Sequence, residues 1–437
     1  MLSSLRICQR GLVHMAGQIS RRNFMSGHFR CQDVWSKRLS SPILQKVNVN
    51  DLFVQLDGRL DDSGSITAVD VDIFANAIVS GDHLDELDDI VHRFRLGTGS
   101  HQTLPTTHHA VVRAYLDFGD SSDLLRILDD RLNYGIFPDN YLNILLLDHF
   151  IKNGDFTSAA KIASMRMLQE DFDCMLANYM SLYACHKYLL NPGEWAPPAE
   201  PVKEDDEEIR VRVAYIRNPF FDDHFDLREP NALVGKTLHY TSRALGDSIG
   251  KNYRALGLIL HKKWNEAENF TSAALKENAR FNSSIIGLMD NFVGSLPEEE
   301  QKALDSVKKV ITAARESSIK GDLLAEVTDQ IKGLVKTEEK KMIDQQTQAY
   351  SDWETLRENV LKFELEEFNK KKRLEEVEKK KKELEEEEQE IFFFDNEDAI
   401  DLEIEKKRAR LPKSKPKSVI SIDYVPPEIT VKKSWVE

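Results

Sequence analysis

Apolar residues recur at helical spacing through the middle of the chain, in a pattern with a period of 35 residues. Residues 106–140 align with residues 141–175, so that Gly119-Asp120 in the first segment returns as Gly154-Asp155 in the second. In each segment, two stretches with an apolar residue at every third or fourth position flank the Gly-Asp pair, which is typical of two amphipathic helices joined by a turn. One such pair cannot bury its apolar face alone. The pattern therefore predicts a stack of pairs, an all-α solenoid.

Three glycines and one proline are expected to set the turns of this repeat. Gly119 and Gly154 follow the first helix of each segment, where glycine tolerates the left-handed conformation that ends a helix. Gly135 is expected to stop the second helix of the first segment. Pro138 then forces an extended residue before the following segment begins.

Less regular copies flank these two segments. Residues 70–95 again form two helical stretches around a Gly-Asp pair, and another copy begins at Met175. An acidic, proline-rich stretch over residues 196–208 interrupts that copy and is predicted to be a solvated loop. We therefore predict helical repeats over residues 50–195 and further helical repeats over residues 209–335.

The C-terminal third is much more highly charged. Residues 337–391 contain almost no Gly or Pro, and their apolar side chains fall in one heptad register. Charged residues occupy several intervening core positions, and a continuous coiled coil would bury them at a cost. We expect a long helix that docks through its first half and is solvated beyond. Residues 392–437 are expected to form a basic, proline-containing extended tail, in which Phe392-Phe393-Phe394 is either a plug for a partner or local core.

Residues 1–36 have the composition of a mitochondrial presequence and leader. Residues 1–32 contain five Arg and no acidic residue, and their apolar side chains would occupy one face of a helix. The segment Arg22-Asn23-Phe24, followed by Met25-Ser26, resembles a matrix-processing site; a disordered basic arm is the alternative. The net charge is −15, and removal of residues 1–24, which carry four Arg, would leave −19.

Composition and motifs argue against several other classes of protein. The four cysteines have no paired spacing, which disfavours a disulfide framework or a zinc module and fits a reducing compartment. The sequence contains no run of 18 apolar residues, so it predicts no transmembrane helix. Gly235-Lys236-Thr237 lacks the earlier glycine of a phosphate-binding loop, since Pro230 occupies that position. His108 and His109 point about 100° apart on a helix. We therefore expect no catalysis, cofactor, metal or small-molecule substrate.

Residues 106–140, with their Gly135-Ile136-Phe137-Pro138-Asp139 ending, resemble a pentatricopeptide repeat. The combination of a presequence, a few degenerate repeats containing NYGIFPDNYLNILLLDHFIK (residues 133–152) and a charged C-terminus is similar to the small-subunit mitochondrial ribosomal protein family number twenty-seven. The resemblance is strongest over about residues 80–280. It implies a structural component of the mitochondrial ribosome that supports translation in the matrix.

In pentatricopeptide proteins that read RNA, the fifth and last residues of each repeat contact a base. In this chain those positions carry Ala110 with Asn140, and Leu145 with Met175, and only Asn140 could hydrogen-bond a base edge. The resemblance therefore favours a scaffold over a sequence-specific reader.

The partners that the resemblance implies are the small-subunit rRNA and neighbouring mitochondrial ribosomal proteins. Two alternatives remain: a free pentatricopeptide RNA-binding or processing factor, and a matrix assembly adaptor that acts through the coiled segment. Because phosphate contacts need local positive charge, the candidate contacts are Lys406, Lys407, Arg408, Arg410, Lys413, Lys415, Lys417, Arg210, Arg212, Arg217, Lys262 and Lys263.

Overall fold

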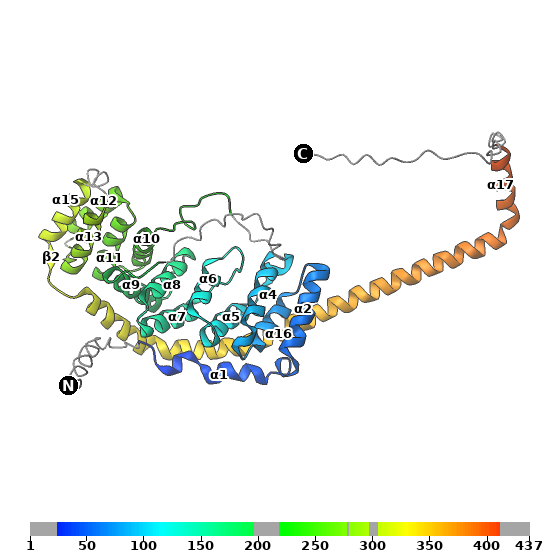
Figure 1. Ribbon diagram of the computed structural model, residues 1–437, viewed down its shortest axis with the longest axis horizontal. Coiled ribbons are helices and arrows are strands. Elements are labelled where there is room, and N and C mark those ends of the chain that lie inside the picture. The colour runs from blue at the N-terminus through cyan, green and yellow to red at the C-terminus, as the bar shows by residue number, and fades with distance from the viewer. Residues whose placement is uncertain (1–23, 196–217, 278, 297–304, 411–437) are drawn as a thin grey trace, which may run out of the picture. The chain divides into compact units, whose positions relative to one another are not determined.

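The computed structural model describes residues 24–195, 218–277, 279–296 and 305–410, and these residues are almost entirely helical (Figure 1). The predicted all-α solenoid is thereby confirmed. The chain divides into two compact units, Met1–Leu361 and Lys362–Glu437.

The repeat unit is a pair of helices joined by a short turn, and the first helices of three successive pairs begin 35 residues apart, at Pro105, Asn140 and Met175. The described repeat helices are α3 (Ala68–Ala77), α4 (Leu84–Leu96), α5 (Pro105–Phe118), α6 (Ser121–Asp129), α7 (Asn140–Asn153), α8 (Phe156–Leu168), α9 (Met175–Leu190), α10 (Pro230–Arg243), α11 (Ser248–Leu260), α12 (Trp264–Lys276), α13 (Ser283–Ser295) and α15 (Asp305–Glu316). The predicted acidic loop, residues 196–208, lies outside the described residues; the helices on either side of it in the sequence, α9 and α10, pack on each other.

Stacking determines how much of each helix is buried. In α6, Leu124, Leu125, Ile127 and Leu128 face the core while the remaining positions are largely exposed. Helix α9 packs on α7, α8 and α10, and its side chains are buried almost all the way round. Two short parallel strands, β1 (Phe281–Asn282) and β2 (Ser318–Ile319), pair with Phe281 opposite Ser318.

The turn glycines follow the prediction in part. Gly135 and Gly154 adopt the left-handed conformation, with φ of 65° and 78°. Gly119 does not: its φ of −105° and ψ of −176° are extended. Glycine is needed there because a Cβ would lie 2.9 Å from Tyr115 Cδ1 and 3.1 Å from Leu84 Cδ1. Helix α6 ends at Asp129, before Gly135, which leaves Leu132 in the turn and largely exposed.

The leader predicted over residues 1–36 is too long. Residues 1–23 lie outside the described residues, but from Phe24 onward the chain is part of the folded body. Its elements are η1 (Gly27–Arg30), α1 (Gln32–Lys37), η2 (Arg38–Ser40), η3 (Leu44–Lys46) and α2 (Val49–Ser63). Phe24, Phe29 and Trp35 are buried. Composition could not reveal this, because apolar residues that anchor a segment to a core look like those of an amphipathic presequence.

The long helix α16 extends over Leu323–Asp395, beyond both predicted ends. It is followed by α17 (Glu397–Arg410), where an extended tail was expected. Proline restricts the residue just before it, so Pro412 does not prevent a helix that ends at Arg410. Acidic side chains in the first turn of α17 and basic ones in the last turn also suit the helix dipole. The remainder of the predicted tail, residues 411–437, lies outside the described residues.

Candidate functional site

The surface formed by the first helices of the repeats, α3, α5, α7 and α9, is the part of the array that could hold a ligand along its length. We call it the first-helix face. Two segments from opposite ends of the sequence lie on it: residues 24–38 and the part of α16 before Lys362. In Figure 1, α1 (blue) and the yellow portion of α16 run beside α5 and α7.

Residues 24–38 contact one repeat after another, in the reverse of chain order. Phe24 packs edge-on against Tyr183 of α9, with ring centroids 5.1 Å apart. The Tyr141 hydroxyl of α7 donates to the Phe29 carbonyl at 2.5 Å. Arg113 of α5 donates to the Arg30 carbonyl and to Gln32. Arg38 donates to the Asn76 carbonyl of α3 and to the Ile78 carbonyl just after this helix. The hydrogen bonds satisfy backbone carbonyls of this segment and of α3 where the two pack together.

Helix α16 follows the same path. The Tyr350 hydroxyl and His109 Nε2 of α5 are hydrogen-bonded at 2.9 Å, and the Trp353 ring lies 5.3 Å from the His109 ring. One turn further on, the Arg357 side chain reaches Asp72 of α3. The two covering segments also touch each other, since the Trp35 and Tyr350 ring centroids are 5.5 Å apart.

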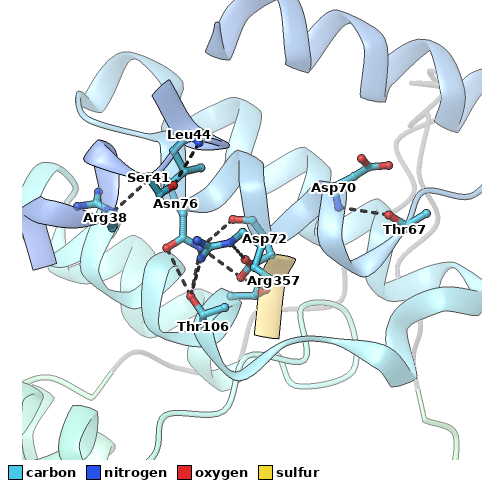
Figure 2. Close-up of polar contacts among 10 residues, drawn as sticks. Arg38, Ser41, Leu44, Thr67, Asp70, Asp72, Asn76, Thr106 and Arg357 are labelled. Atoms are coloured by element: carbon cyan, nitrogen blue, oxygen red, sulfur yellow. Dashed lines mark hydrogen bonds and ion pairs between the residues drawn. The ribbon is translucent and has the colours of Figure 1, made fainter. Parts of the chain in front are cut away.

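Arg357 and Asp72 form a buried ion pair within a larger polar network (Figure 2). Arg357 Nε donates to Asp72 Oδ2 at 2.6 Å, and its guanidinium also donates to Thr106 Oγ1 at 3.2 Å. Asp72 accepts further hydrogen bonds from Thr107 and Asn76. Burial raises the pKa of Asp72, and the Arg357 charge opposes that rise. The network fixes α16 in one register on the repeats, because any slip would leave two buried charges unpaired.

His109 lies at the centre of an aromatic cluster formed by Trp35, Tyr141, Tyr350 and Trp353. Burial lowers the pKa of His109 well below its ordinary value, and the nearby Arg113 and Arg38 charges lower it further. The folded protein therefore holds this imidazole neutral.

This neutral imidazole predicts a loss of stability in acid. The unfolded chain binds a proton at residue 109 below a pH of about 6.5 while the folded chain does not, so the contribution of His109 is lost as pH falls below that value. The thermal midpoint should fall between about pH 7.5 and pH 5 by more in the unmodified protein than in a His109→Gln variant. His101→Gln, at an exposed histidine, is the matched control. An equal fall in the protein and the His109→Gln variant would contradict the prediction.

The positions that would read RNA bases are not available on this face. Ala110 and Leu145 are buried, and Ala110 lines a small cavity beneath α1 with Trp35 and Arg38. Asn140 uses its amide within the protein: it donates to Asp171 at 2.7 Å and accepts from Arg166. Met175 is 46% exposed but cannot hydrogen-bond a base edge as a donor.

Six of the predicted phosphate contacts belong to the described part of the chain, on two separate segments. Lys262 and Lys263 lie in the turn between α11 and α12, and Lys262 Nζ is 4.0 Å from Glu229 Oε2. Lys406, Lys407, Arg408 and Arg410 lie exposed on the last turns of α17, where Lys407 pairs with Glu403. The other candidates, Arg210, Arg212, Arg217, Lys413, Lys415 and Lys417, lie outside the described residues.

The features that superficially suggested an enzyme have structural roles. Gly235 of the Gly-Lys-Thr sequence lies inside α10, where a Cβ would be 2.5 Å from Leu260 Cβ of α11. Lys236 donates to the Asp223 carbonyl. Among the described residues, no cluster of three or more His, Cys, Asp and Glu side chains could hold a metal ion. In the same part of the chain, no helix combines the length and apolarity needed to cross a membrane.

Sequence reasoning missed the covering of the first-helix face. The only local signal was the placement of Phe24, Phe29 and Trp35 beyond the arginine-rich stretch, at spacings that do not follow one helical face.

The fold and this face define a class: an all-helical repeat protein whose first-helix face is covered by two segments of its own chain. The family model described as Mitochondrial 28S ribosomal protein S27 matches residues 2–383. The chain belongs to this family, which confirms the resemblance found in the sequence. Membership makes it a protein of the small subunit of the mitochondrial ribosome, and implies the mitochondrial matrix and a structural rather than an enzymatic role.

Proposed function

We propose that this protein is an architectural component of the small subunit, which holds neighbouring ribosomal proteins in place and contacts rRNA through local basic patches. The observation that carries the proposal is the occupied first-helix face. Residues 24–38 and α16 fill the surface along which a repeat protein would read bases. A partner must therefore bind other surfaces of the array or the charged helix.

The exposed part of α16 supports the binding of neighbouring proteins. From Lys362 onward, several apolar side chains of α16 are each more than half exposed. They are Phe363, Leu374, Val377, Leu384 and Ile391, which share one heptad register, and Phe368, which lies outside it. Phe392 is also 62% exposed, which favours a docking role over local core for that sequence. An exposed apolar stripe flanked by charge is typical of a surface that a partner covers.

The free RNA-processing factor fits less well. Such a factor needs polar side chains at its reading positions, and Ala110 and Leu145 offer none. A sucrose gradient of mitochondrial lysate separates these functions. We expect the protein to sediment with intact small subunits. Recovery at the top of the gradient while the subunits remain intact would overturn the ribosomal role and favour a free factor or adaptor.

The basic end of α17 gives a prediction about rRNA binding. Changing Lys406, Lys407, Arg408 and Arg410 to Gln should weaken association with the small subunit and flatten its dependence on salt. The log–log slope should fall by about one for each phosphate that the variant no longer neutralises. The measurement is co-sedimentation over a series of salt concentrations.

The matched control changes Lys379, Lys380, Lys381 and Lys382 to Gln. It removes the same charge from α16, where Lys379 and Lys381 already pair with Glu383 and Glu385. If both variants flatten the slope equally, net charge and not phosphate binding at α17 explains the effect.

A further inference from the structure

The Asp148 carboxylate of α7 contacts the backbone at Phe24 and Met25. Its Oδ1 atom accepts hydrogen bonds from the Phe24 and Met25 backbone nitrogens, both at 3.2 Å. The next nitrogen, that of Ser26, donates to Glu339 Oε1 of α16 at 2.7 Å. Two carboxylates from different helices therefore converge on three successive backbone nitrogens.

Among the described residues, no cationic side chain forms an ion pair with the Asp148 carboxylate. Burial raises the pKa of Asp148, and the Glu339 charge raises it further, while Lys152 on α7 acts in the opposite direction. Lys187 of α9 lies over the neighbouring Tyr183 and Phe156 rings and not on the carboxylate. Within the described part of the chain, no cationic side chain lies within ion-pair distance of Asp148. A half-buried carboxylate held only by neutral amides is a receptor for a positive charge.

Phe24 is packed as a core residue. It is 9% exposed, it belongs to the main hydrophobic cluster, and its ring meets Tyr183 edge-on. A cut after Phe24, as the sequence pattern suggested, would remove this ring and leave a cavity on α9. A cut before Phe24 keeps the ring and places the new terminus on Asp148.

We propose that the mature chain begins at Phe24, and that its α-ammonium group forms an ion pair with Asp148 which fastens residues 24–38 to the first-helix face. Water hydrolyses the Asn23–Phe24 peptide bond, so that Asn23 leaves as a carboxylate and the Phe24 nitrogen becomes an amine that takes up a proton. Arg22 stands two residues before the cut. The proposal extends the presequence hypothesis and does not depend on how the protein functions in the ribosome.

The Asp148 side chain makes a specific contribution after cleavage. Cleavage replaces the neutral Phe24 amide donor with a cationic amine, so that Coulombic attraction to the Asp148 carboxylate adds to the existing hydrogen bond. Cleavage therefore strengthens the hold on residues 24–38, and with them on α16, which these residues contact through Trp35 and Tyr350. Removal of the presequence would thus complete the covered face.

Two measurements test the proposal. The full-length chain is imported into isolated mitochondria, recovered, and analysed by mass spectrometry of its N-terminal peptide; we expect a peptide that starts at Phe24. The α-amino pKa of the recovered protein is then measured from the pH dependence of amine labelling. It should lie at about 9 or above, against an ordinary value of about 8, because an adjacent carboxylate favours the charged form.

Asp148→Asn should return the α-amino pKa to its ordinary value, whereas Asp344→Asn, at an exposed carboxylate of α16, should leave it raised. A mature terminus at any residue other than Phe24 overturns the proposed cut. An ordinary α-amino pKa in the unmodified mature protein overturns the ion pair. This last result decides the question even if Asp148→Asn fails to fold.

Discussion

Replacement of Arg357 by Met is expected to lower the free energy of unfolding by about 3–5 kcal/mol, because removal of one partner leaves a buried charge uncompensated. Asp72 is fully buried and the Arg357 side chain is 4% exposed, so water cannot replace the missing guanidinium. The destabilisation should appear as a lower denaturant midpoint. It should also appear as faster proteolysis of α16, because the Arg357 network fixes this helix to the repeats.

The matched control is Arg59→Met, which breaks the exposed pair between Arg59 and Asp70. Exposed ion pairs contribute about 0–1 kcal/mol, so this variant should unfold close to the unmodified protein. A second comparison places Asp72→Leu in the Arg357→Met background. The double variant should be more stable than the sum of the single changes predicts, because no buried charge is then left alone. Strict additivity would show that the two side chains do not stabilise each other.

Gly257→Ala is expected to destabilise the protein by about 1–3 kcal/mol, although alanine normally favours a helix over glycine by about 1 kcal/mol. Helices α10 and α11 cross so closely that a Cβ on Gly257 would lie 2.5 Å from the His239 nitrogen and 2.7 Å from the Gly235 carbonyl oxygen. These are backbone atoms, so the helices themselves must separate. Thermal or denaturant unfolding measures the destabilisation.

Gly287→Ala provides the control for helix propensity. Gly287 lies within α13, and apart from its chain neighbours and the nearby backbone of its own helix, no described atom lies within 4 Å of the Cβ that alanine would add. This variant should be as stable as the unmodified protein or more so. If Gly257→Ala were equally harmless, the close crossing of α10 and α11 would not limit stability, and the structural role assigned to the Gly-Lys-Thr glycine would also be in doubt.

The occupied face connects stability with function. A helical repeat array that leaves its first-helix face open can bind a flexible strand of nucleic acid. Here the face is covered by aromatic side chains of the same chain. Around His109 of α5 lie the rings of Trp35, Tyr350 and Trp353. The face therefore contributes to the core.

The sequence by itself determined the local architecture. The 35-residue period predicted where α5, α7 and α9 begin, because the spacing of apolar residues within each helix pair indicates which face of the helix is buried. The left-handed turn at Gly154 was equally readable, since glycine adopts this conformation more easily than residues with a Cβ. The long charged helix was also evident, and so was the absence of polar side chains at Ala110, Leu145 and Met175.

Only the tertiary structure decided what covers the first-helix face. Periodicity reports which side of a helix is apolar but not which segment packs on it. The decisive contacts join residues far apart in sequence, such as Asp72 with Arg357 and Phe24 with Asp148. The apolar positions of α16 look the same whether they meet a partner or the repeats. The need for glycine at residue 119 likewise depends on Leu84 of another repeat, which no local pattern records.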